Sequence, residues 1–115
     1  MVRFLWLEGW GEFGNGSECG PVDLQAENVS IDPVTFIYSN SPVVMSDGGY
    51  TIRFDHADDV SGPYTEAASV SEAGDESGIK AHQVARSSLK QFVKAHFSMD
   101  GGASYYFSIG VLANL

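Results

Sequence analysis

Residues 79–97 read IKAHQVARSSLKQFVKAHF, and this stretch decides the fold class that the sequence predicts. At about 100° per residue, its apolar side chains gather on one side of a helical wheel. That side comprises Ala81, Val84, Ala85, Ser88, Leu89, Phe92, Val93 and His96. Asp75, Glu76 and Ser77 precede the stretch, where they suit an N-cap and the positive end of a helix dipole. The pattern predicts one amphipathic helix over Ile79–Phe97.

The opposite side of the predicted helix is basic, and it supplies the candidate interaction residues Lys80, Arg86, Lys90 and Lys94. The chain has a net charge of −9 at pH 7, and all its acidic residues except Asp100 lie in residues 1–76. A basic face on an acidic body can bind the acidic surface of a second copy. It can equally lie against the acidic part of its own chain. Both alternatives remain open.

Strands are expected on both sides of this helix. In Tyr50–His56, apolar and polar side chains alternate, which is typical of a strand with one buried face. The predicted strands are Val2–Leu7, Val34–Tyr38, Val43–Met45, Tyr50–His56 and Ala103–Leu112. The fold class is therefore α+β, an antiparallel sheet of four to five strands with the helix packed on one face. The expected core is Phe4, Trp6, Phe36, Ile52, Phe54, Val84, Leu89, Phe92, Tyr105, Phe107 and Ile109.

The length of 115 residues suits a single domain over residues 1–115. Residues 57–78 are rich in Ser, Gly and acidic residues and poor in large apolar ones. We expect them to form a long acidic loop at about 57–78.

The sequence offers three chemical motifs, and each is rejected on physical grounds. Gly9 to Gly14 spell G-x-G-x-x-G, but the residues that follow cannot continue a helix, as a dinucleotide site requires. Asp55 to Asp59 group three carboxylates with His56, yet Asp55 and His56 point to opposite faces of a strand. Cys19 is the only cysteine, and no motif places a base beside a nucleophile, although a catalytic triad formed by residues distant in the sequence stays open. We predict no catalytic residue, no metal site and no cofactor.

The net charge of the chain excludes two classes of partner. A net charge of −9 repels nucleic acid and anionic membranes, so neither is an expected partner. The main hypothesis is a non-enzymatic structural subunit of a larger homo-oligomeric assembly, such as a virion accessory, decoration or connector protein. Its partners would be other copies of itself or neighbouring subunits. It would be made in the cytoplasm and incorporated into a virus particle or other shell.

Two other hypotheses compete with self-assembly. The alternative is a small-molecule or carbohydrate-binding domain, or a small enzyme, that uses the Trp- and Gly-rich N-terminal segment around Trp6, Trp10 and Phe13. The third is a regulatory protein that presents the basic helix to a partner. The molar mass in solution would separate the first hypothesis from the second.

Overall fold

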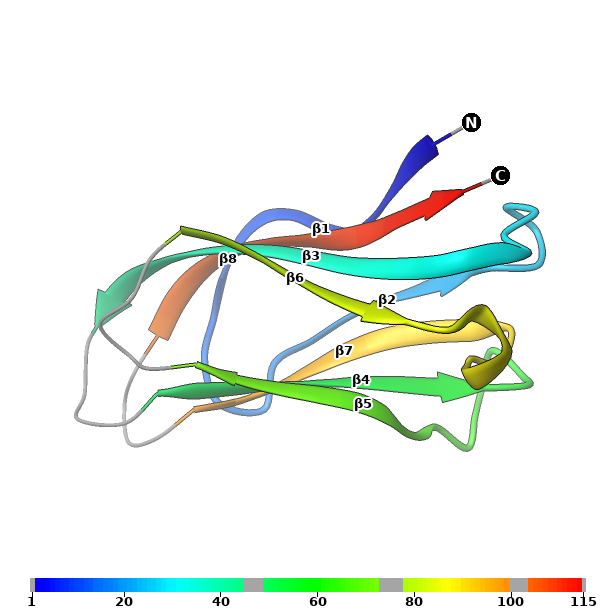
Figure 1. The fold of residues 1–115 in the computed structure, drawn as a ribbon. Helices are drawn as coiled ribbons and strands as arrows, with labels where there is room; N and C mark the ends of the chain where they lie inside the picture. The colour runs from blue at the N-terminus through cyan, green and yellow to red at the C-terminus, as the bar shows by residue number, and fades with distance from the viewer. Residues whose placement is uncertain (1, 45–48, 73–77, 100–103, 115) are drawn as a thin grey trace.

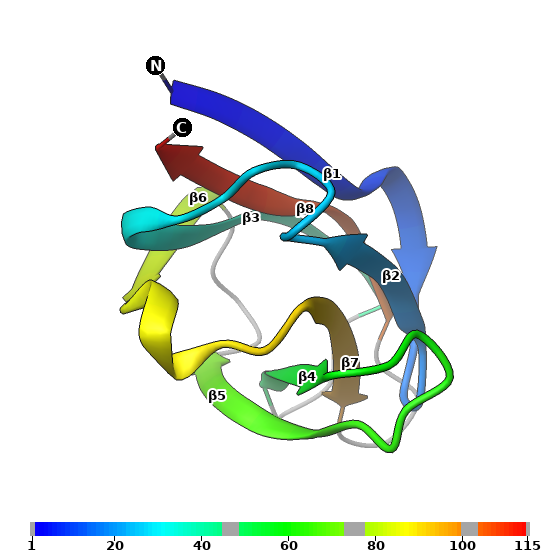
Figure 2. The ribbon, with the colours of Figure 1, turned by 90° about the vertical axis from the view of Figure 1, so that its right-hand side faces the viewer.

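The chain forms a sandwich of two antiparallel sheets in a computed structural model that describes residues 2–44, 49–72, 78–99 and 104–114. Sheet A has the strand order β1-β8-β3-β6, and sheet B has the order β2-β7-β4-β5. Figure 1 shows the two layers, and Figure 2 shows them along the strands. The strands are β1 (Val2–Phe13), β2 (Glu18–Asp23), β3 (Ile31–Val44), β4 (Tyr50–Ala57), β5 (Thr65–Glu72), β6 (Gly78–Val84), β7 (Phe92–Met99) and β8 (Ser104–Asn114).

The predicted α+β fold is wrong, because residues 79–97 do not form a helix. They form most of β6, a short 3-10 turn η1 (Arg86–Ser88) and most of β7. In β7 the buried residues Val93, Ala95 and Phe97 alternate with more exposed ones, as the period of a strand requires. The apolar residues of two short strands in different sheets thus fall on one side of a helical wheel, although no helix forms there. Serines at the turn, which favour caps and turns over helix interiors, were the contrary signal.

The loop predicted at 57–78 is also wrong in part, because it contains β5, which pairs with β4 from Tyr50↔Glu72 to His56↔Thr65. This strand lies at the edge of sheet B, where charged side chains such as Glu66 and Glu72 oppose pairing with another chain. Residues 73–77 lie outside the described ones. The strands predicted at Val34–Tyr38 and Tyr50–His56 are confirmed within β3 and β4. Of Val43–Met45, the first two residues end β3, and Met45 lies outside the described residues.

The core lies between the two sheets and is joined by aromatic contacts. Phe36 of sheet A stacks on Phe54 of sheet B with ring centroids 4.0 Å apart, and both side chains are fully buried. The expected core residues that are buried are Phe36, Ile52, Phe54, Leu89, Phe107 and Ile109. Those that are half-buried are Phe4, Val84 and Phe92. Trp6 is 58% exposed, which contradicts its expected core position, and the side chain of Tyr105 lies outside the described ones.

The stack between the sheets generates a stability prediction. We expect Phe54→Ala to lower the free energy of unfolding by about 3–5 kcal/mol, because it leaves a cavity opposite Phe36. Ile79→Ala is the control, since Ile79 is 77% exposed, and it should change stability by less than about 0.5 kcal/mol. Urea unfolding followed by circular dichroism measures both. Equal losses in the two variants would contradict the assignment of the core.

Candidate functional site

A line of polar side chains runs along the outer face of sheet B. In β7, Lys94, His96 and Ser98 point away from the core, because they alternate with the buried positions. The register of β4 places Arg53 beside His96 and Thr51 beside Ser98. We call this line the polar track and define it as Glu18, Thr51, Arg53, Lys94, His96 and Ser98.

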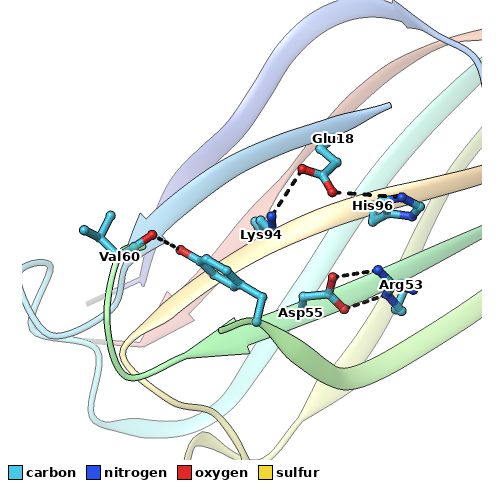
Figure 3. A network of polar contacts seen from close by, with 7 residues as sticks. Glu18, Arg53, Asp55, Val60, Lys94 and His96 are labelled. Atoms are coloured by element: carbon cyan, nitrogen blue, oxygen red, sulfur yellow. Dashed lines mark hydrogen bonds and ion pairs between the residues drawn. The ribbon is translucent and has the colours of Figure 1, made fainter. Parts of the chain in front are cut away.

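Charged groups in the polar track hold one another in place (Figure 3). The Nζ atom of Lys94 lies 3.2 Å from Oε2 of Glu18, and Nε2 of His96 lies 3.9 Å from Oε1 of the same carboxylate. Arg53 donates from Nε to Oδ1 of Asp55 at 2.8 Å and from a terminal nitrogen to Oδ2 at 3.1 Å. Asp55 is nearly buried, so this bidentate contact fixes the plane of a half-exposed guanidinium. The hydrogen bond that Arg53 donates to the Asp55 carboxylate raises the pKa of Arg53 above its usual value.

A hollow of about 280 Å³ opens at one end of the polar track. Its lining residues are Glu18, Cys19, Gly20, Pro21, Val60, Tyr64 and Lys94. The Nζ atom of Lys94 lies 4.4 Å from the centre of the Tyr64 ring, and the Tyr64 hydroxyl donates to the Val60 carbonyl at 2.9 Å. These contacts fix the ring and the ammonium against each other.

Gly20 permits the close approach of β2 that shapes this hollow. Its φ is +105°, and a Cβ there would lie 2.9 Å from the Leu7 side chain and 3.0 Å from Cβ of Lys94. A residue with a side chain would push β2 away from Lys94. The glycine therefore helps to keep the carboxylate of Glu18 within reach of the ammonium.

A second hollow, of about 380 Å³, opens at the other end of the polar track. Its lining residues are Asn15, Gly49, Tyr50, Thr51, Ser71, Glu72, Ser98 and Met99. The hydroxyl oxygens of Thr51 and Ser71 lie 2.9 Å apart on its wall. Lys94 and Ser98 are four residues apart in one strand, which corresponds to roughly 13 Å. The polar groups thus follow a line, which suits an extended ligand with many hydroxyl groups.

The structure separates the four basic residues that sequence placed on one face. Lys80 in β6 lies 3.5 Å from Glu72, and Lys90 lies 3.8 Å from Asp58. Arg86 in η1 donates from its guanidinium to the carbonyls of Val29 at 2.7 Å and Leu89 at 2.8 Å. Only Lys94 belongs to the polar track. Each of the four has a partner within its own chain, and the helical face that would have joined them does not exist.

The rejected motifs have other roles in the structure. Gly9 to Phe13 lie in β1, so the G-x-G-x-x-G pattern opens no helix. In the Asp55–Asp59 segment, Asp59 accepts bonds from the backbone and the hydroxyl of Ser61 at 2.9 and 2.7 Å. Among the described residues, no group of three or more His, Cys, Asp or Glu side chains is placed to hold a metal ion. In the same part of the chain, no helix has the length and apolar character needed to cross a membrane.

Sequence reasoning selected only one residue of this surface, Lys94, as a candidate interaction residue. It did not select the other members of the polar track or Tyr64, which are Glu18, Thr51, Arg53, His96, Ser98 and Tyr64. The alternation in β4 was visible and placed Arg53 on the face opposite the core. Nothing in the sequence placed Glu18 beside Lys94, because strands β2 and β7 are far apart along the chain and meet only when sheet B forms.

Comparison with known proteins reveals a similarity in fold. No family model matches the sequence, and no curated protein matches it either. The structure is similar to that of the CBM22-1 and GH10 modules of the Clostridium thermocellum endo-1,4-β-D-xylanase 10B, complexed with xylohexaose. The TM-score is 0.52 and the identity 7%, over 96% of this chain and 27% of that chain. The likeness is one of fold.

A second solved structure is the CBM22-1 xylan-binding domain of Paenibacillus barcinonensis Xyn10C. Its TM-score is 0.49 at 12% identity, over 98% of this chain and 94% of that domain. This chain therefore spans about a quarter of the length of the first structure and nearly the whole of the second.

Cys19, in the wall of the smaller hollow, provides a prediction about the reactivity of its thiol. Cys19 is buried, and burial together with the nearby charge of Glu8 raises its pKa to about 12, so its thiol stays protonated near neutral pH. We expect almost no reaction of the native protein with a disulfide reagent at pH 8 and one reactive thiol per chain in urea. Equally fast labelling in both conditions would show that β2 does not pack against β7 as described.

Proposed function

We propose that this chain is a carbohydrate-binding domain that binds an extended, neutral polysaccharide such as xylan along the polar track. The observation that carries the proposal is the elongated row of donors and acceptors on the outer face of sheet B, with a hollow at each end. The similarity in fold to a structure that contains a CBM22-1 module and xylohexaose supports this choice of ligand class.

The chemistry of the polar track suits sugar hydroxyls, which both donate and accept hydrogen bonds. Glu18 offers acceptors, Lys94 and Arg53 offer donors, and the hydroxyls of Thr51 and Ser98 offer both. Because ion pairs already orient Glu18, Lys94 and Arg53, binding would cost little side-chain entropy. The carboxylates of Glu18 and Asp55 balance the two cations, so the track favours an uncharged polymer over a charged one.

The ring of Tyr64 offers the apolar part of the site. One face of a sugar ring carries C–H groups, which pack on the flat face of an aromatic side chain. Tyr64 is half-buried and lines the smaller hollow with Lys94, so a sugar ring there would meet an aromatic surface and charged donors together. A hollow of about 280 Å³ is of a size to accept one sugar ring of the chain.

The main hypothesis from the sequence, a self-assembling structural subunit or virion component, has no support in the structure. Its physical basis was a basic helical face, and residues 79–97 form strands instead. The carbohydrate-binding alternative is favoured, but the polar track lies outside the N-terminal segment around Trp6, Trp10 and Phe13 that the sequence suggested. Phe13, which that hypothesis placed in the site, is buried and stacks on Phe97 with centroids 4.7 Å apart. The side chain of Trp10 lies outside the described ones.

Calorimetric titration with xylohexaose tests the proposal. We expect wild-type protein to bind, and Tyr64→Ala and Lys94→Ala each to weaken binding by roughly tenfold, equivalent to about 1.4 kcal/mol. Arg3→Ala is the matched control, because Arg3 also has an acidic partner, Glu27, but lies in β1 of sheet A and lines neither hollow. It should bind as the wild type does.

Two results would contradict the proposal. One is the absence of wild-type binding to xylohexaose and to oligosaccharides of β-glucan and mannan. The other is equal weakening in Lys94→Ala and Arg3→Ala, which would indicate an effect of net charge rather than a site on sheet B.

A further inference from the structure

The outer face of sheet A carries an aromatic pair, of which Phe4 is half-buried and Trp6 is exposed. Phe4 and Trp6 point outward from β1, because they alternate with the buried residues Leu5 and Leu7. Their ring centroids lie 4.5 Å apart with an angle of 70° between the rings. Trp6 is 58% exposed, an unusual position for so large an apolar side chain. We call this pair the aromatic shelf.

A glycine in the neighbouring strand makes room for the aromatic shelf. Gly110 of β8 pairs with Trp6, and a Cβ at Gly110 would lie 2.5 Å from two carbons of the Phe4 ring. The Phe4 ring therefore lies against backbone where any other residue would place a side chain. Phe4, fixed in this way, contacts Trp6 edge to face and limits the orientations of the indole. The shelf is preorganised, which lowers the entropic cost of binding a ligand.

The residues in register with the aromatic shelf across sheet A are uncharged. Across sheet A, the residues in register with Trp6 are Gly110, Ile37 and Ala81. Those in register with Phe4 are Leu112, Thr35 and Gln83. In a chain with a net charge of −9, this uncharged patch offers no counter-charge to an ionic partner. A second copy would itself carry −9, so mutual repulsion opposes pairing of two shelves.

We propose that the aromatic shelf is a second carbohydrate site, which packs against sugar rings exposed at the surface of an insoluble neutral polysaccharide. An indole on an open sheet face presents one flat surface. The C–H face of a sugar ring can pack on this surface without the help of a charged group. The shelf lies on sheet A and the polar track on sheet B, so the two sites face opposite sides of the sandwich. One domain could then hold two polysaccharide chains, which would raise its effective affinity for a packed surface. The choice of ligand class rests on the proposed function.

Depletion binding to insoluble xylan, beside calorimetry with xylohexaose, tests the second site. We expect Trp6→Ala to weaken binding to insoluble xylan by roughly tenfold, a typical loss for an aromatic stacking contact. The same variant should bind xylohexaose as the wild type does, because the polar track is intact. Trp6→Tyr keeps a flat ring and should retain most of the binding. Ile79→Ala, a 77% exposed residue on the same sheet face, is the control and should have no effect.

Several outcomes would overturn the second site. Unchanged binding of Trp6→Ala to insoluble xylan, or no wild-type binding to it, would show that the shelf takes no polysaccharide. If a folded Trp6→Ala protein lost binding to both insoluble xylan and xylohexaose, the two ligands would share one site. A wild-type dimer in light scattering that Trp6→Ala dissociates would show that a second copy occupies the shelf. Failure of the proposed function is distinguishable, because it appears as absent xylohexaose binding in the wild type.

Discussion

The contact of Phe36 with Phe54 across the sandwich is the constraint on which the other features depend. Two sheets that bury their inner faces against each other must turn every second side chain of each strand outward. The polar track and the aromatic shelf are therefore the outward halves of strands whose inward halves form the core. In β7 the same strand supplies Phe97 to the core and His96 to the outer face. Loss of the core would thus remove both surfaces.

The sequence predicted the secondary structure correctly only where its apolar residues fit a single periodicity. In Tyr50–His56 the alternation is unambiguous, and β4 lies where it was expected. In residues 79–97 the apolar positions fit a helix, and those of Phe92–Phe97 also fit the strand β7, whereas Ile79 and Ala81 of β6 are exposed. The pairing of β6 with β3 and of β7 with β4 decided the outcome. Such pairings bring together residues that are distant along the chain, which a local pattern cannot reveal. β5 was missed for a related reason, because an edge strand of small polar residues resembles a loop.

The candidate site was even less predictable, because its members come from separate strands. Lys94 was selected from the sequence for a helical face, yet its partners are Glu18 of β2 and Tyr64 before β5. These contacts are partly exposed, and an exposed ion pair contributes at most about 1 kcal/mol to stability. Their importance lies in orientation. They hold hydrogen-bond donors and acceptors in a line. Because these contacts add little to the stability of the fold, we place the ligand along this line.

Nuclear magnetic resonance titration of the labelled protein with xylohexaose tests the central claim most directly, since it locates the ligand without any substitution. If the polar track binds the sugar chain, the largest amide shift changes occur at Arg53, Lys94 and His96, and the amides of β8 around Gly110 stay unchanged. Changes confined to β1 and β8, or spread evenly over the chain, would contradict the account.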